Sequence, residues 1–287
     1  MKYTKYHALG NDYIVINPTD IKKELDPDEI RLICHRNYGV GSDGILYGPL
    51  DSQSCNFGLK IFNPDGSEAE KSGNGLRIFA RSLIDKSFAN ELTFTVETLG
   101  GPVSCEVNPN RKSVTVKMGK VSFDSRIIPV EGPSRQVLNE TIKIDGRNMK
   151  FSAATVGNPH CVVLSENPSP EMAKRYGPDI EIDPRFFNRT NVQFMKIIDS
   201  NNIKIEIWER GAGYTLASGS SSIAAAAVAH KLGFCDADIT VHMPGGKIKI
   251  KLDDDFVATM TGPVTKVCDG NISDEMFEKI LITNPAY

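Results

Sequence analysis

The chain carries two copies of one sequence pattern at a constant interval. Residues 60–80 align without a gap with residues 206–226, so each residue of the first segment has its counterpart 146 positions later. Upstream, residues 10–16 (GNDYIVI) match residues 157–163 (GNPHCVV) at an interval of 147. Because the matched segments keep their order, they indicate an internal repeat of domain size, and we expect two domains that fold alike.

Composition limits the classes of function. The 287 residues are 40% hydrophobic and 24% charged, which is typical of a globular protein with room for two cores. A net charge of −3 with mixed signs gives no basic stripe for nucleic acid, and no apolar run approaches the roughly 18 residues that span a bilayer. The opening residues do not resemble a signal peptide. The six cysteines form no CxxC pair, so we expect a cytoplasmic protein without a disulfide framework or a metal site.

Strand periodicity dominates the chain, and helices are few. The clearest helix is predicted over Ser220–Lys231, an alanine-rich segment whose small side chains indicate burial, and an equivalent helix over about Gly75–Ser87. A third, peripheral helix is predicted to begin after Pro27. Strands are predicted over Thr93–Thr98, Ser113–Met118, Ile203–Trp208 and Lys247–Leu252.

These elements predict an α/β fold of two pseudo-symmetric domains, each a barrel-like β-sheet wrapped round one central helix. We expect the N-terminal domain to comprise residues 1–120, and the C-terminal domain residues 121–262. The tail, residues 263–287, is expected to return to the first domain, because TGPV near its start echoes MGKV at residues 118–121.

Ser72 and Ser218 occupy equivalent places in the repeat, each just before a predicted central helix. The unpaired N–H groups at a helix N-terminus attract a carboxylate or a developing anion, and Gly73, Gly75 and Gly219 allow a ligand to approach the backbone. The plain alternative is that each serine is only a helix cap. Two similar groups delivered by two copies of a unit suit a nearly symmetric reaction, such as proton transfer between the two faces of a carbon.

The motifs HALGND, GVGSDG, FNPDGSEAEKSGNGLR, VGNPHCV, TNVQF and WERGAGYTLASGS, in this order, resemble the diaminopimelate epimerases, cofactor-independent enzymes of the lysine and cell-wall pathway. The resemblance covers nearly the whole chain. It implies a homodimer that epimerises LL- to meso-diaminopimelate by two-base transfer of the α-proton, without pyridoxal phosphate or metal. It also implies the fold of two pseudo-symmetric halves.

Carried over to this sequence, the resemblance places the two bases at Ser72 and Ser218, where the family has cysteine. It implies that His160 stands beside this pair. The residues it implies for substrate binding are Asn11, Asn63, Gly73, Asn74, Asn158, Asn191, Glu209, Arg210, Gly219 and Ser220.

Serine at both base positions leaves three explanations open. A serine hydroxyl that lies about five pKa units above a thiol costs roughly 7 kcal/mol more to deprotonate. The chain is therefore an epimerase impaired by two Cys-to-Ser exchanges, a diverged isomerase or racemase acting on another substrate, or a non-catalytic amino-acid binder. Divergence at Ile78 and in the turn after Ser218, where the family often has a further cysteine and GTG, extends beyond the two positions.

The polar set predicts the kind of ligand. Amides, one carboxylate and one guanidinium suit a zwitterionic amino acid with a second charged end. Glu209 and Arg210 have a simpler alternative as a surface ion pair. For Asp12, Asp43 and Asp65, which lie in Gly-rich turns, we expect the structural role of capping the local backbone.

Overall fold

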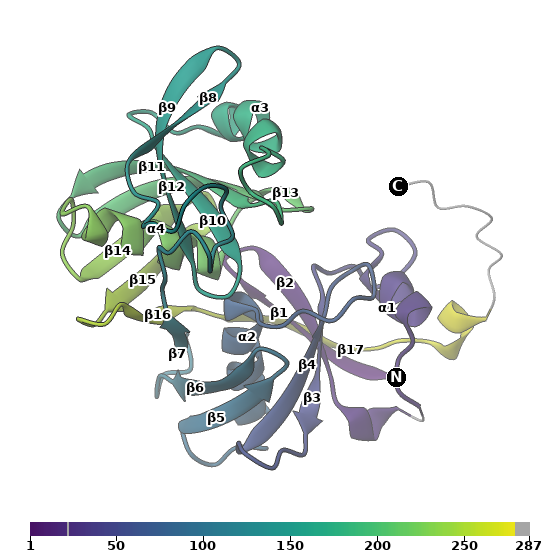
Figure 1. Ribbon diagram of the computed structural model, residues 1–287. Helices are drawn as coiled ribbons and strands as arrows, with labels where there is room; N and C mark the ends of the chain where they lie inside the picture. The colour runs from purple at the N-terminus through teal and green to yellow at the C-terminus, as the bar shows by residue number, and fades with distance from the viewer. Residues whose placement is uncertain (22, 279–287) are drawn as a thin grey trace. The chain divides into compact units, whose positions relative to one another are not determined.

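The computed structural model describes residues 1–21 and 23–278. The chain divides into two compact units (Figure 1). The first unit comprises Met1–Ala8, Asp12–Lys112 and the chain from Val264, and the second comprises Leu9–Asn11 and Ser113–Pro263.

The unit boundary lies earlier than the expected position after residue 120. Strand β7 (Ser113–Lys120) belongs to the second unit because it pairs antiparallel with β16 (Val257–Pro263). Strand β17 (Thr265–Asn271) instead pairs antiparallel with β1 (Lys2–Ala8) of the first unit. Residues 279–287 of the expected tail lie outside the described residues.

In the first unit, β2 and β3 are parallel, β3 and β4 antiparallel, β4 and β5 parallel, and β5 and β6 antiparallel. Besides β1 and β17, its elements are β2 (Asn11–Ile16), η1 (Pro18–Asp20), α1 (Pro27–Cys34), β3 (Ile45–Leu50), β4 (Phe57–Phe62), α2 (Gly73–Asp85), β5 (Thr93–Thr98), β6 (Gly101–Val107) and η2 (Asp274–Phe277).

The second unit repeats this pairing: β10 and β11 are parallel, β11 and β12 antiparallel, β12 and β14 parallel, and β14 and β15 antiparallel. Besides β7 and β16, its elements are β8 (Glu140–Ile144), β9 (Arg147–Thr155), β10 (Pro159–Leu164), α3 (Pro170–Glu181), β11 (Asn191–Asp199), β12 (Asn202–Glu209), β13 (Gly213–Thr215), α4 (Gly219–Lys231), β14 (Asp238–Met243) and β15 (Gly246–Leu252). The pairing confirms the internal repeat and the pseudo-symmetric α/β fold.

The two central helices are equivalent in length and position. Helices α2 and α4 each have 13 residues, and Gly73 and Gly219 at their starts are 146 positions apart. Helix α4 packs against seven strands of its unit, β9 to β12 and β14 to β16. Every residue from Ser221 to Ala229 is buried, because alanine-rich faces let strands approach the helix from all sides. Helix α2 packs in the same way against β1, β3 and β6.

Both predicted central helices begin earlier than expected. Helix α4 starts at Gly219 rather than Ser220, and α2 covers Gly73–Asp85 rather than Gly75–Ser87. At the far end of α2, Ser87 adopts a left-handed backbone with φ of 59°, a conformation that stops a helix.

Helix α3 was not predicted from the sequence. Ser169 caps it by accepting a hydrogen bond from the Met172 N–H, and Pro170 occupies its first turn. The helix also contains Pro178, a residue that normally ends a helix and so conceals it in the sequence. Gly177 lies where a Cβ would come 2.5 Å from Trp208, so α3 packs closely on β12.

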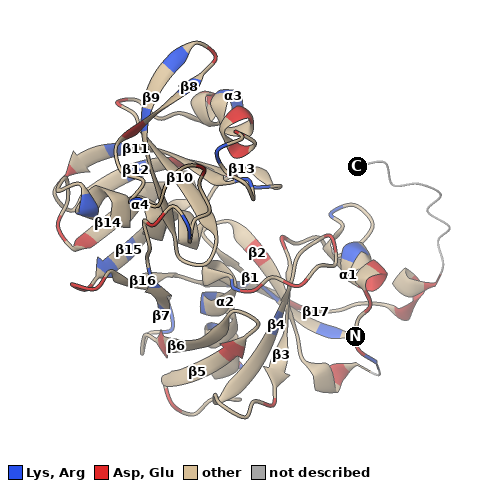
Figure 2. Cartoon of the chain, viewed as in Figure 1, with Lys and Arg blue, Asp and Glu red and all other residues tan. Residues whose placement is uncertain are grey.

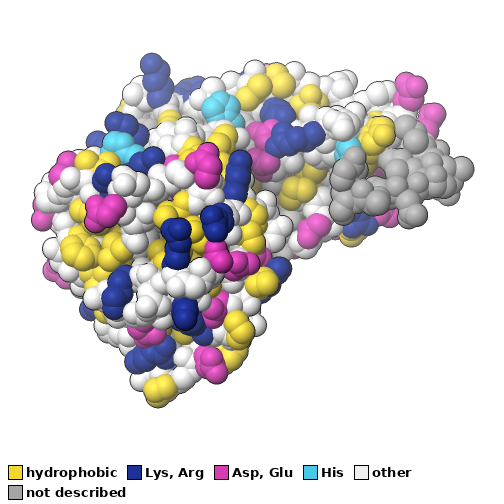
Figure 3. Space-filling model, turned by 90° about the horizontal axis from the view of Figure 1, so that it is seen from above, with side chains coloured by type: hydrophobic (Ala, Val, Ile, Leu, Met, Phe, Trp, Pro, Cys, Tyr) yellow, Lys and Arg dark blue, Asp and Glu magenta, His cyan; other side chains and the backbone are white. Residues whose placement is uncertain are grey.

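Lys and Arg residues, like Asp and Glu residues, are distributed along the described elements of each unit (Figure 2). Positive and negative side chains lie side by side on the face seen in Figure 3. Among the described helices, none combines the length and the apolar character needed to cross a bilayer.

Candidate active site

Ser72 and Ser218 are the N-caps of the two central helices. The Ser72 Oγ accepts a hydrogen bond from the Gly75 N–H at 3.0 Å, and the Ser218 Oγ accepts one from the Ser221 N–H at 3.4 Å. A Cβ at Gly75 would lie 3.2 Å from the Ser72 Oγ, so glycine leaves room for the shorter bond. The capping role considered from the sequence is present at both serines, and each side chain lies at the first turn of its helix.

The Ser72 hydroxyl has a second partner that the sequence reasoning missed. The hydroxyl of Tyr13, on β2, lies 3.1 Å from the Ser72 Oγ, and either oxygen can donate. Tyr13 is buried, with 8% of its surface exposed. A signal for it existed, because the repeat that matches GNDYIVI with GNPHCVV pairs Tyr13 with His160.

Arg77 lies one turn into α2 and is fully buried. Its Nη2 donates to the Asn74 Oδ1 and its Nε to the Gly73 carbonyl at 3.4 Å. Among the described residues, no carboxylate pairs with Arg77 and its Nη1 has no hydrogen-bond partner. Burial lowers the pKa of Arg77 to about 9, which leaves the guanidinium charged at neutral pH. The equivalent position in α4 is the apolar Ile223, so of the two central helices α2 alone has a buried cation near its start.

His160 is fully buried on β10 of the second unit. Burial, with a smaller effect of Arg210, lowers its pKa to about 3, so the imidazole is neutral at physiological pH. Its Nδ1 accepts a hydrogen bond from the Gln193 side chain at 3.1 Å, which leaves Nε2 to donate to the Asn158 Oδ1 at 3.0 Å. Both ring nitrogens therefore serve to orient amides.

Asn158 and Gln193 connect His160 to the first turn of α4. The Asn158 Nδ2 donates to the Ser220 Oγ at 3.4 Å, and the Gln193 Nε2 donates to the Ser221 Oγ at 2.9 Å. His160 thus reaches the neighbours of Ser218 through amides. Gln193, which sequence reasoning missed, lies on β11 with its Oε1 buried and without a partner among the described residues.

The loop that follows β12 is held by buried polar groups of the second unit. Asn191 donates to the Pro159 carbonyl at 2.9 Å and accepts from the Arg210 N–H at 3.0 Å, so both ends of its amide are used. The Arg210 Nη1 donates to the Asn188 carbonyl at 2.8 Å. Glu181, at the end of α3, accepts from the Trp208 Nε1 at 2.7 Å and was missed together with that helix.

The remaining sequence-predicted residues fall into the two units. Asn63 follows β4 of the first unit, where its Nδ2 donates to the Ser67 Oγ at 3.0 Å across a turn. Asn11, at the start of β2, groups with the second unit, and Glu209 ends β12 there. The first unit therefore brings Ser72, Gly73 and Asn74 together at one helix end. The second unit collects Asn158, His160, Ser218, Gly219 and Ser220 around the other helix end.

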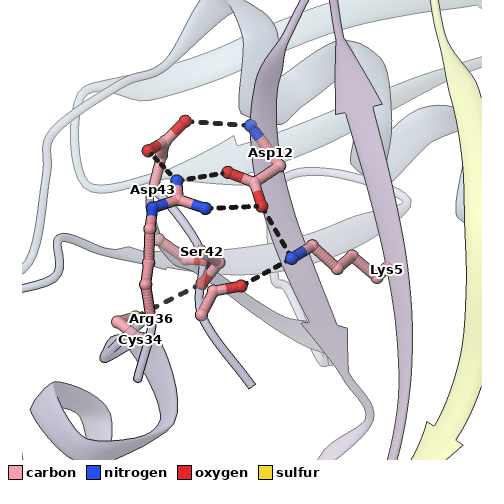
Figure 4. Close-up of polar contacts among 8 residues, drawn as sticks. Lys5, Asp12, Cys34, Arg36, Ser42 and Asp43 are labelled. Atoms are coloured by element: carbon pink, nitrogen blue, oxygen red, sulfur yellow. Dashed lines mark hydrogen bonds and ion pairs between the residues drawn. The ribbon is translucent and has the colours of Figure 1, made fainter. Parts of the chain in front are cut away.

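An ion cluster fixes the start of β2 beside Tyr13 (Figure 4). The Asp12 carboxylate accepts from Arg36 at 2.8 Å and pairs with Lys5 at 2.8 Å, and Arg36 also contacts Asp43 at 2.6 Å. Burial works against the charged form of Asp12, but the hydrogen bonds from Arg36 and Lys5 outweigh it and lower the pKa of this carboxyl. The Asp12 carboxylate therefore joins side chains in an ion cluster, in place of the local capping that the sequence predicts.

Asp65 caps the local backbone, as predicted, whereas Asp43 accepts from a backbone N–H that lies 31 positions away in the chain. The Asp43 Oδ2 accepts from the Asp12 N–H at 3.0 Å, and the Asp65 Oδ1 accepts from the Ser67 N–H at 2.9 Å. Among the described residues, no group of three or more His, Cys, Asp and Glu side chains is arranged to hold a metal ion.

Solved structures share this fold at low sequence identity. A hydroxyproline epimerase from Agrobacterium vitis aligns with a TM-score of 0.69 at 15% identity, covering 95% of this chain and 90% of that one. A Bacillus anthracis phenazine biosynthesis protein of the PhzF family aligns with a TM-score of 0.68 at 15% identity, covering 95% and 99%. These similarities show the fold alone.

Sequence comparison is more specific. The family model described as Diaminopimelate epimerase matches residues 3–123 and 152–267. The chain is 60% identical over 277 residues to Diaminopimelate epimerase 2 of Nostoc sp. strain PCC 7120, covering 96% of this chain and 97% of the relative. It is 38% identical to the diaminopimelate epimerase of Caldanaerobacter subterraneus, covering 95% and 99%. The chain therefore belongs to the diaminopimelate epimerase family, whose members are isomerases.

Proposed function

We propose that this protein binds diaminopimelate and transfers its α-proton between the two faces of the α-carbon, slowly, because serine occupies both proton-transfer positions. The observation that carries the proposal is the pair of equivalent 13-residue helices, each beginning directly behind a serine at those positions. The first-turn amides of such helices stabilise a carboxylate and the negative charge that develops beside it in the transition state.

The substrate's two ends have different partners in this proposal. The first-turn amides at Gly73, Asn74, Gly219 and Ser220 bind the α-carboxylate of the reacting carbon. The distal amino and carboxylate groups bind to the polar set Asn11, Asn63, Asn158, Asn191, Glu209 and Arg210. The buried charge of Arg77 supports an anion at the start of α2, because it has no carboxylate partner among the described residues.

The chemical step uses one base on each face. One group removes the α-proton and leaves the electron pair on the α-carbon next to the bound carboxylate, while the other delivers a proton to the opposite face. In this account no cofactor takes part, since helix amides stabilise the charge. Serine costs roughly 7 kcal/mol more to deprotonate than a thiol if their pKa values differ by about five units. That penalty corresponds to about a 10⁵-fold lower rate.

A non-catalytic amino-acid binder is the second candidate, and one observation favours it. His160, on β10 of the second unit, is neutral and directs both ring nitrogens to amides, so it supplies no base to Ser218. A diverged isomerase acting on another amino acid is the third. We also infer a cytoplasmic location, because all six cysteines are free. From the family resemblance we infer a homodimer, and light scattering tests for a mass of twice 31.5 kDa.

Thermal unfolding in the presence of ligands tests whether diaminopimelate is the ligand of this protein. We expect LL- and meso-diaminopimelate to raise the Tm in a concentration-dependent manner, because a ligand that binds only the folded state stabilises it. Lysine is the matched control, since it lacks one carboxylate, and should bind at least about 10-fold more weakly. A chain that responds equally to lysine and diaminopimelate, or to neither, contradicts the proposed substrate.

A further inference from the structure

We propose that the phenol of Tyr13 is the proton partner of position 72, which makes a Tyr–Ser pair the acid–base unit of the first half. This inference rests on the proposed function, because it takes Ser72 as a proton-transfer position. The hydroxyl of Tyr13 lies 3.1 Å from the Ser72 Oγ. The cap bond from the Gly75 N–H occupies one side of that same oxygen and holds it in place.

The Tyr13 ring is held in this position by its surroundings. A Cβ at Gly44 would lie 2.7 Å from the Tyr13 Cε1, so the absence of a side chain at Gly44 gives the ring its place. The preceding residue, Asp12, is tied by Arg36 and Lys5 (Figure 4), and the Asp12 N–H donates to Asp43. The start of β2 is therefore anchored from both sides, and the phenol keeps a defined direction toward Ser72.

A phenol supplies what serine lacks. Its ordinary pKa is about 10, only about 1.5 units above a thiol, whereas the serine hydroxyl is taken to lie about five units above it. In the reacting state, Tyr13 is a phenolate that accepts the Ser72 hydroxyl proton while the Ser72 oxygen takes the α-proton of the substrate. The Cα–H bond and the Ser72 O–H bond break, new O–H bonds form on Ser72 and Tyr13, and the electron pair stays on the α-carbon.

The internal repeat shows that this pairing belongs to one half only. His160 is the counterpart of Tyr13 in the second unit, but its Nε2 donates to Asn158. Within the described part of the second unit, the Ser218 Oγ accepts only the Ser221 N–H. The two proton-transfer positions are therefore chemically different: position 72 has a titratable side-chain partner, and position 218 has a backbone cap.

A thiol introduced at position 72 reports on this coupling without any substrate. The variant Ser72→Cys is compared with the double variant Ser72→Cys, Tyr13→Phe, and the pKa of the new thiol is read from the pH dependence of its alkylation, resolved by peptide mass spectrometry. Phenylalanine keeps the ring beside Gly44 and removes only the hydroxyl. Two charged residues lie near position 72: Lys71 precedes it in the chain, and Arg77 lies near the start of α2. Both are present in both variants.

We expect Tyr13→Phe to raise the pKa of the thiol at position 72 by about one unit, because a hydrogen bond to the thiolate favours the charged form. The matched control is Ser218→Cys with and without Tyr13→Phe, in which the thiol pKa should not change. A thiol at position 72 that titrates identically with and without the phenol overturns the proposal, provided that far-UV circular dichroism shows both variants folded.

Exchange of the substrate's α-proton for deuterium separates this proposal from the proposed function. Proton transfer from Ser72 to Tyr13 predicts that Tyr13→Phe alone lowers the rate at which diaminopimelate exchanges its α-proton in deuterated buffer by at least about 10-fold. If the unmodified protein and Tyr13→Phe exchange the α-proton equally fast, the proposed role of Tyr13 is wrong, even if Tyr13→Phe changes the pKa of the thiol at position 72. If the unmodified protein binds diaminopimelate but exchanges nothing, the proposed function is wrong, and the thiol titration still decides whether Tyr13 is coupled to position 72.

Discussion

Ser72 and Ser218 have two roles, helix capping and proton transfer, and each role favours a different type of residue. As N-caps they accept a backbone N–H, a task for which a hydroxyl is better than a thiol because sulfur is a weak acceptor. Replacing a good N-cap costs about 1 kcal/mol of stability. As bases, serines are far weaker than cysteines. Serine at both positions thus stabilises the helix starts while lowering the capacity for proton transfer.

Replacing Arg77 should affect the stability of the protein and its affinity for the substrate differently. Replacing this buried cation with methionine should leave the Tm unchanged or raise it, because an unpaired buried charge is costly to desolvate. The same change should weaken diaminopimelate binding about 10-fold, since the positive charge near the start of α2 is lost. Thermal unfolding and isothermal titration calorimetry measure the two effects.

The matched control for Arg77→Met is Arg81→Met, one turn further along α2. Arg81 forms an ion pair with Asp85 at 2.9 Å, so its loss should lower the Tm and leave the affinity unchanged. Equal affinity of the unmodified protein and Arg77→Met would show that the buried guanidinium has no part in anion binding.

At the scale of elements, the sequence predicted what depends on local pattern and missed what depends on tertiary contact. The central helices follow from the repeat and from their capping serines, with errors of one or two residues at the ends. Helix α3 was missed because Pro178 lies inside it. The Tyr13 contact joins residues 59 positions apart, a distance that no local pattern encodes. The neutral state of His160 likewise follows from burial.

The ion cluster that joins β2 to the loop around Arg36 should make stability depend on pH. Hydrogen bonds lower the pKa of Asp12 in the folded state. Its contribution is therefore present above the unfolded value of about 3.9 and is lost as pH falls below it. At pH 7, Asp12→Asn should lower the free energy of unfolding by about 1–3 kcal/mol. Near pH 3, urea unfolding should show a smaller difference.

The control for this cluster is Asp254→Asn at an exposed turn, which should change stability by less than about 0.5 kcal/mol at either pH. A constant difference between the unmodified protein and Asp12→Asn from pH 7 to pH 3 would mean that the charge of Asp12 contributes nothing to the fold.

At the scale of the whole molecule, the two units repeat one architecture, but different residues surround the start of the central helix in each unit. In the first unit the end of α2 has a buried cation, Arg77, and a phenol, Tyr13. In the second unit α4 begins beside neutral amides and a neutral histidine. A symmetric scaffold with asymmetric helix ends suits a reaction in which one position removes a proton while the other supplies one.

The incorporation of deuterium at the α-carbon of LL-diaminopimelate tests the central claim most directly, when the unmodified protein is compared with the double variant Ser72→Cys, Ser218→Cys. If the binding groups are intact and only the bases are weak, both proteins bind the substrate. The double variant then exchanges the α-proton at least about 10³-fold faster, as expected for bases several pKa units stronger. A double variant that binds diaminopimelate and still incorporates no deuterium would contradict the account.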